Sequence, residues 1–220
     1  MPQILLMNPN ANSATTRAMV AIASKILPGV SGWTAPEGPQ MIVTEATLDA
    51  AAELVGAAVL PACDGVIVSA FGDPGRARLA ARLSCPVLGI GAAAARQASA
   101  LASASGDSSG GSSGGGFAVV TTTPDLAPRI DRMMAGQGGA AYLGCYLTQG
   151  EPEALMLDAA ALDAALLEAS ERAARAGAAA VIIGGGPLGE AAERLAECAP
   201  VPLISPIRAA ATEMAALLAR

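Results

Sequence analysis

The sequence predicts an α/β protein of two similar lobes, each built on a mainly parallel sheet, with a cleft between them. Short apolar runs rich in Val and Ile alternate with alanine-rich stretches of helical period along the 220 residues. The second half repeats the pattern of the first. Polar or glycine-rich residues follow several of the expected strands, where open α/β sheets bind their ligands.

The alternating pattern sets the expected elements in order along the chain. We expect strands near residues 3–8, 40–44, 65–70, 86–90, 117–122, 142–147, 179–184 and 201–205. We expect helices near residues 12–26, 46–58, 75–83, 92–104, 125–135, 154–176, 188–198 and 207–219, several of them opened by Ser, Thr, Asp or Pro.

The repeat is clearest in two pairs of segments. Val66–Pro74 (VIVSAFGDP) corresponds to Val181–Pro187 (VIIGGGP), and Cys85–Ile90 (CPVLGI) to Val201–Ile207 (VPLISPI). Between the halves, residues 103–116 are rich in Gly and Ser and have the composition of a flexible segment. We therefore expect a first lobe from residues 1–102 plus 207–220 and a second lobe from residues 117–206.

Composition excludes several classes of function. The net charge of -6 and the lack of basic clusters argue against nucleic-acid or membrane partners. No apolar run or basic leader predicts membrane insertion or secretion, so the expected location is the cytoplasm. The four cysteines form no CxxC pair, and there is no histidine, which rules out Ser/His/Asp triads and His-ligated zinc. We expect no cofactor, while Asp, Glu or Cys ligands for a metal and a homo-oligomer both stay open.

The loops after four expected strands are the candidate binding site for a small molecule. They carry hydroxyl, amide and backbone N–H donors, which suit a carboxylate or an oxyanion, and Asn8 belongs to the same set. A capping role in the following helix explains any one of these residues equally well. The candidate binding residues are Asn10, Ser69, Ala70, Phe71, Gly72, Thr121, Thr122, Thr123, Gly184, Gly185, Gly186 and Pro187.

Two residues are candidates for catalysis. Asp73 follows a strand end and has the right chemistry for a base, although Asp before Pro is also a common turn device. Cys145 lies within an apolar strand, where a buried structural thiol is the more frequent case. Glu45 fits best as an acidic residue in the first turn of its helix.

The strand-end motifs resemble those of the aspartate/glutamate/hydantoin racemase superfamily, most closely its hydantoin and allantoin racemase branch. Ile4–Asn10 (ILLMNPN), Asp64–Gly75 (DGVIVSAFGDPG), Pro86–Ile90 (PVLGI) and Phe117–Thr122 (FAVVTT) carry the resemblance, which spans essentially the whole chain. It implies two Rossmann-like lobes related by a pseudo-two-fold axis, with the active site between them.

The resemblance also implies two catalytic cysteines, one from each lobe, which move a proton on opposite faces of the substrate. In this chain Ala70 and Gly185 stand at those positions, and neither has a titratable group. We therefore expect chemistry other than two-cysteine racemisation on a small hydantoin-like ring or carboxylate, such as hydrolytic desulfuration of a thiohydantoin. The alternatives are a racemase or decarboxylase with another acid/base, and a small-molecule sensor without catalysis.

Overall fold

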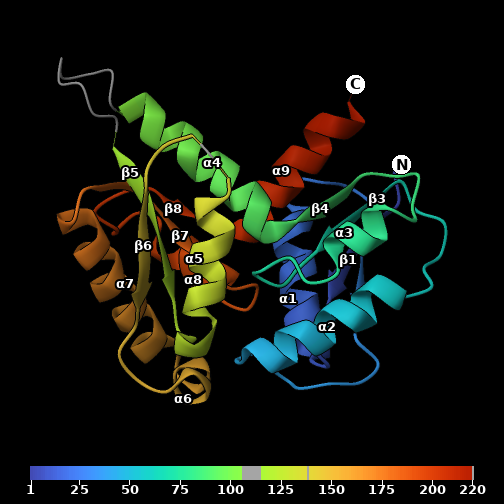
Figure 1. Ribbon diagram of the computed structural model, residues 1–220, viewed down its shortest axis with the longest axis horizontal. Helices are drawn as coiled ribbons and strands as arrows, with labels where there is room; N and C mark the ends of the chain where they lie inside the picture. The colour runs from blue at the N-terminus through green and yellow to red at the C-terminus, as the bar shows by residue number, and fades with distance from the viewer. Residues whose placement is uncertain (106–114, 138, 220) are drawn as a thin grey trace.

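The computed structural model describes residues 1–105, 115–137 and 139–219, and their strands form two separate parallel sheets (Figure 1). The first sheet has the order β2-β1-β3-β4 and the second the order β6-β5-β7-β8. This identical order confirms the predicted α/β fold of two equivalent lobes. The strands are β1 (Ile4–Asn8), β2 (Val30–Thr34), β3 (Gly65–Val68), β4 (Val87–Gly89), β5 (Gly116–Thr121), β6 (Tyr142–Leu147), β7 (Ala178–Ile183) and β8 (Leu203–Ile204).

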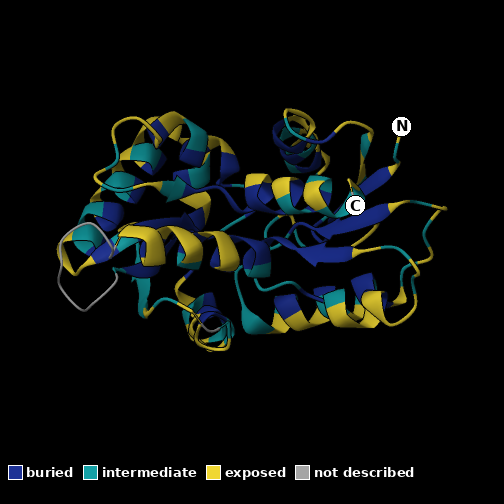
Figure 2. Cartoon of the chain, turned by 90° about the horizontal axis from the view of Figure 1, so that it is seen from above, coloured by how far each residue is buried: buried dark blue, intermediate teal, exposed yellow. Residues whose placement is uncertain are grey.

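Helices cover both faces of each sheet, as parallel strands require. The central strands β1, β3, β5 and β7 are buried almost throughout, and the helices expose one side only (Figure 2). The helices are α1 (Ser13–Ser24), α2 (Glu45–Ala57), α3 (Arg76–Ala80), α4 (Ile90–Ser105), the 3-10 helix η2 (Pro124–Leu126), α5 (Ala127–Ala135), α6 (Pro152–Leu157), α7 (Ala159–Arg175), α8 (Gly189–Leu195) and α9 (Pro206–Leu218).

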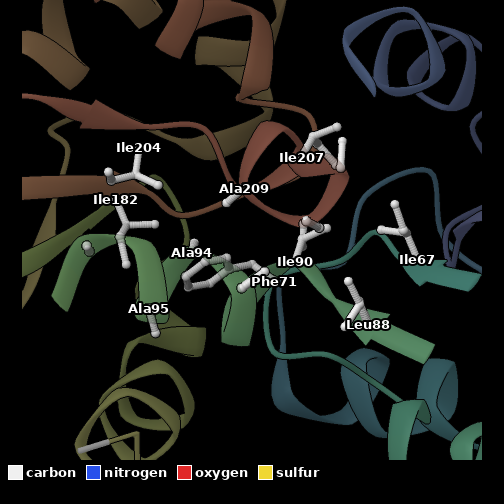
Figure 3. Packing of buried hydrophobic residues seen from close by; sticks show 14 of the residues in the cluster. Ile67, Phe71, Leu88, Ile90, Ala94, Ala95, Ile182, Ile204, Ile207 and Ala209 are labelled. Carbon is white, nitrogen blue, oxygen red and sulfur yellow. The ribbon is translucent and has the colours of Figure 1, made fainter. Parts of the chain in front are cut away.

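Two helices are exchanged between the lobes. Helix α4 follows the last strand of the first sheet but packs on β5 and β7 of the second, while α9 follows the second sheet and packs on β3, β4 and α1 of the first (Figure 1). Alanines such as Ala94 and Ala95 let α4 approach the second sheet closely, beside Ile182 (Figure 3). Met214 of α9 lies against Gly65 at the start of β3. The two helices also contact each other, and Arg96 of α4 forms a bidentate ion pair with Glu213 of α9 at 2.8 and 3.1 Å.

The structure differs from the sequence-based prediction at one strand and one helix, and it describes only the ends of the Gly/Ser-rich segment. The strand expected near residues 40–44 is absent from the described chain, and the first sheet instead gains β2, which pairs with β1 along its whole length. The apolar run at 41–43 has no neighbouring strand and leads directly into the Thr44 cap of α2. The helix expected over 154–176 is two helices, because Asp158 caps α7 with its side chain. Of the Gly/Ser-rich segment, residues 106–114 lie outside the described residues; residues 103–105 belong to α4, and Gly116 begins β5.

Within the described residues, no helix is both long and apolar enough to cross a membrane.

Candidate functional site

Loops at the carboxyl ends of β1, β3, β5 and β7 meet in one cavity between the lobes. All the candidate binding residues except Gly72 line it; Gly72 faces Leu48 of α2. The cavity volume is about 50 Å³, which is room for a few water molecules and indicates a small ligand. The lining residues are Asn10, Met41, Ile42, Ser69, Ala70, Phe71, Thr121, Thr122, Thr123, Leu126, Ile130, Gly184, Gly185, Gly186, Pro187 and Leu188.

On the first lobe, an asparagine network shapes the loop after β1. The buried Asn8 side chain donates from Nδ2 to Asn10 Oδ1 at 2.8 Å and to Thr16 Oγ1 at 2.9 Å. Asn8 Oδ1 in turn accepts from the backbone N–H of Asn10 at 3.2 Å. Asn8 is thus occupied with holding the loop, while no described residue accepts a hydrogen bond from Nδ2 of Asn10. The free donor at this corner of the cavity is the Asn10 amide group.

The loop after β3 brings Ser69, Ala70 and Phe71 to the cavity. Ser69 is 1% exposed, and its hydroxyl donates to the carbonyl of Met7 at 2.6 Å, which ties the loop to β1. The backbone N–H of Phe71 forms no hydrogen bond with another described residue. The Ser69 side chain therefore has a structural bond, and the backbone is the polar group that this loop offers to a ligand.

On the second lobe, three consecutive threonines are buried at the end of β5: Thr121 is the last residue of the strand, and Thr122 and Thr123 follow it. The Thr121 hydroxyl donates to the carbonyl of Gly184 at 2.9 Å and lies 3.1 Å from the Thr123 hydroxyl. The Thr122 hydroxyl is buried and has no hydrogen-bond partner among the described residues. Leaving a buried hydroxyl unpaired costs about 1–3 kcal/mol, so a ligand atom at this place would supply a missing partner.

The glycines after β7 let the two lobes come close together. A Cβ atom on Gly186 would lie 2.5 Å from the backbone oxygen of Ser69, and one on Gly184 would lie 3.3 Å from the ring of Phe71. A Cβ on Gly185 would meet only the flexible side chain of Leu188, at 3.0 Å, and its backbone is outside the left-handed region. Gly186 is thus required by contact between the lobes, and Gly184 chiefly by Val119 of its own lobe, 2.7 Å from the added Cβ, whereas Gly185 has room for a small side chain.

An apolar wall completes the cavity, and sequence reasoning missed its members. Met41 and Ile42 come from the coil before α2, and Leu126, Ile130 and Leu188 come from the second lobe. Two ion pairs join these elements across the lobes: Glu45 with Arg132 at 3.0 Å and Asp49 with Arg129 at 3.3 Å. Met41 and Ile42 belong to the apolar run for which the sequence predicts a strand, and in the structure this run lines the cavity instead.

Asp73 does not line the cavity. Its two carboxylate oxygens accept hydrogen bonds from the backbone N–H groups of Gly91 at 2.8 Å and Ala92 at 2.9 Å, at the start of α4. Burial raises the pKa of Asp73, and the two N–H donors partly offset that effect. Asp73 is also the one described non-glycine residue with a positive φ, of 51°. The carboxylate therefore caps the N-terminus of α4 from a position distant in the sequence. A catalytic role for Asp73 remains a prediction.

Cys145 lies in the middle of β6, opposite Val119 of β5, and it too is away from the cavity lining. Burial raises the pKa of its thiol to about 12, with Asp131 adding to the effect. At neutral pH such a thiol is protonated and is a poor base or nucleophile. Its catalytic role likewise remains a prediction.

Among the residues that the structure describes, none that lines the cavity has a titratable side chain. The site can therefore donate hydrogen bonds, but these described walls supply neither acid nor base. Elsewhere in the described residues, no group of three or more Cys, Asp or Glu side chains is arranged to hold a metal ion. What the arrangement offers chemically is stabilisation of negative charge by neutral donors.

Comparison with known proteins gives a family match over nearly the whole chain. Residues 4–214 match the family model described as Asp/Glu/Hydantoin racemase. No curated protein matches the chain in sequence.

Several solved structures share the fold. Allantoin racemase from Pseudomonas fluorescens is 25% identical with a TM-score of 0.82, covering 99% of this chain and 91% of that one. Allantoin racemase from Klebsiella pneumoniae is 26% identical with a TM-score of 0.77, covering 100% and 88%. Unliganded arylmalonate decarboxylase is 17% identical with a TM-score of 0.63, covering 99% and 92%, and at that identity the likeness concerns the fold alone.

Proposed function

The chain belongs to the Asp/Glu/hydantoin racemase family, and from this we propose that it is an enzyme acting on a small hydantoin-like ring or carboxylate without two-cysteine racemisation. The observation that carries the proposal is the uncharged lining of the inter-lobe cavity. Stereoinversion by proton transfer needs an acid/base on each face of the substrate. The resemblance puts the two cysteines at Ala70 and Gly185, both in that lining, and neither residue can transfer a proton.

The donors around the cavity support a reaction in which negative charge develops on oxygen or sulfur. Within the described parts of the chain, three donors form no hydrogen bond: the Thr122 hydroxyl, Asn10 Nδ2 and the Phe71 backbone N–H. Neutral donors that are fixed before the reaction stabilise an anionic transition state without needing to reorganise. No described residue of the lining carries a positive charge, which favours a neutral imide-like ring over a dianionic substrate.

Hydrolysis of a thiohydantoin is the reaction that we favour. Hydroxide adds to the ring C=S carbon, and the negative charge that forms on sulfur is stabilised by the donors. Collapse of the adduct re-forms a carbonyl and releases sulfide, so that one C=S group and one water become one C=O group and hydrogen sulfide. Since no lining side chain acts as a base, the attacking hydroxide comes from solvent.

Decarboxylation is the second candidate, and the apolar wall of Met41, Ile42, Leu126, Ile130 and Leu188 favours it. A carboxylate held against apolar side chains loses its hydration, and cleavage of the C–C bond releases neutral CO₂ and leaves the electron pair on the α-carbon. The same donors hold the resulting enolate, which takes its proton from solvent. No side-chain base is needed for the bond cleavage.

A substrate panel tests these proposals. We expect sulfide release from 5-substituted thiohydantoins, measured together with CO₂ release from α-aryl or α-alkyl malonates and with chiral chromatography of hydantoins. CO₂ release without sulfide release would select the second candidate. Racemisation with loss of the α-proton would overturn both and support a racemase with another acid/base. Ligand binding with no turnover of any compound would support a sensor.

The pH dependence of turnover gives an independent test of the uncharged site. Hydrolysis by solvent hydroxide should speed up about tenfold per pH unit over the stable range of the protein, while decarboxylation should be nearly independent of pH. A bell-shaped profile of kcat would contradict the proposal, because it would report an essential side-chain acid and base in the bound complex.

A further inference from the structure

Two of the four cysteines lie next to each other just before the amino-terminal ends of two strands of the first sheet. The cavity lies at the opposite, carboxyl ends of the strands. Cys63 precedes β3 and Cys85 precedes β4, and these two strands are neighbours with Val66 paired to Val87. Their sulfur atoms are 3.9 Å apart, and both residues are partly exposed. The other two cysteines have no such neighbour: Cys145 is in β6, and Cys198 follows α8 in the second lobe.

We propose that Cys63 and Cys85 are a reversible oxidation site, which forms an intramolecular disulfide by exchange with a small disulfide such as oxidised glutathione. The geometry supports this because neighbouring strands lie about 4.8 Å apart, within the range that a disulfide spans. The sulfur atoms must approach to about 2.0 Å. Rotation of two partly exposed side chains at the ends of strands provides that movement without shifting the sheet.

The chemistry balances as two consecutive exchanges. The thiolate of one cysteine attacks a sulfur of oxidised glutathione, which releases one reduced glutathione and leaves a mixed disulfide on the protein. The second cysteine then attacks the protein sulfur of that mixed disulfide and releases the second reduced glutathione. Two protein thiols are oxidised, one glutathione disulfide is reduced, and the two protons remain with the two glutathione thiols.

The bond would close a ring from residue 63 to residue 85, and this ring carries part of the candidate site. It contains β3, the cavity loop with Ser69, Ala70 and Phe71, and helix α3. A crosslink over this length restricts the unfolded chain more than the folded one. For a protein of this size we expect the oxidised form to melt about 5–10 °C above the reduced form.

The test uses the full chain and does not depend on the proposed activity. The protein is equilibrated with oxidised glutathione, free thiols are alkylated, and peptides are mapped by mass spectrometry. We expect one crosslinked peptide pair joining Cys63 to Cys85, free thiols at Cys145 and Cys198, full reversal by dithiothreitol, and the rise in melting temperature. The crosslink and the rise should disappear in Cys63→Ser and in Cys85→Ser, and both should persist in Cys198→Ser.

Two results would overturn the proposal. The first is a failure of the native protein to form the disulfide at a ratio of oxidised to reduced glutathione that oxidises a model dithiol. In that case Cys63 and Cys85 would either remain free thiols or remain as stable mixed disulfides with glutathione. The other is a disulfide that joins either residue to Cys145 or Cys198. Because the mapping is done on the native chain, a variant that fails to fold does not affect either result.

Discussion

The loops after β3 and β7 occupy equivalent places in the two lobes, but they are held in different ways. The β3 loop is fixed by its side chains: Ser69 bonds to Met7 of β1, and Asp73 caps α4. The β7 loop is instead held by close backbone packing: Gly186 has no side chain and lies directly against the backbone of Ser69. The matching segment of the second lobe, Val181–Pro187, contains no acidic residue, and Ser205, the N-cap of α9, makes no side-chain capping bond to that helix, which is the counterpart of α4. Duplication has kept the strands while the loops that form the cavity have diverged.

The largest effect in this comparison is expected from Gly186→Ala. The new Cβ would lie 2.5 Å from the Ser69 backbone oxygen and 2.8 Å from the Met19 sulfur, so the lobes must separate to admit it. We expect the free energy of unfolding to fall by about 1–3 kcal/mol, measured by urea denaturation, and any activity to fall with it.

The matched control is Gly185→Ala in the same loop. Its Cβ meets only the Leu188 side chain, which can move, so the free energy of unfolding should change by less than about 1 kcal/mol. Equal losses in the two variants would mean that contact between the lobes does not fix this loop.

Asp73→Ala is expected to have the next largest effect. It removes both acceptors from the start of α4, and we expect a loss of about 1–2 kcal/mol in the free energy of unfolding. Asp73→Asn keeps one acceptor and tolerates the positive φ, so it should recover about half of that loss. If Asp73→Asn folds with native stability but its kcat falls more than tenfold, the carboxylate takes part in catalysis. Capping of α4 would then not be its whole role.

Restoring both thiols tests whether the divergence of the loops removed proton transfer. In Ala70→Cys with Gly185→Cys, both new side chains begin in the cavity lining, and Gly185 has an ordinary φ. We expect the double variant to exchange the α-proton of a 5-substituted hydantoin in deuterated water above the rate of the native chain. Rapid exchange and inversion by the native chain would show that another acid/base pair is present.

The smallest effect is expected from Cys145→Ser. With the thiol pKa raised to about 12, only about one molecule in 10⁴ carries a thiolate at pH 8, and that fraction grows only as the pH approaches 12. We expect kcat/KM to stay within twofold of the native value and alkylation of this thiol to be slow at neutral pH. A large loss of kcat in a folded variant would restore Cys145 as a catalytic candidate.

The repeated motifs were enough to predict the two lobes, seven of the eight strands and the loops that meet at the cavity. The sequence did not reveal β2, because Val30–Thr34 contains Ser and Gly and owes its extended form to pairing with β1. It also suggested a strand at Met41 and Ile42, whose apolar side chains instead close the cavity from a coil. The roles of Asp73 and Asn8 could not be predicted either, since their hydrogen-bond partners are set by the packing of distant or looped segments.

The exchange of α4 and α9 bears on how the chain reaches its folded state. The first sheet ends at Gly89, but α9, which covers one of its faces, begins only at Pro206. Until the second half of the chain has been synthesised, β3 and β4 lack that cover, so the first half cannot complete its own core. Contacts between residues this far apart in sequence slow folding. The lobes therefore fold as one cooperative unit, and separating the two halves of the gene would leave each protein fragment with an uncovered sheet.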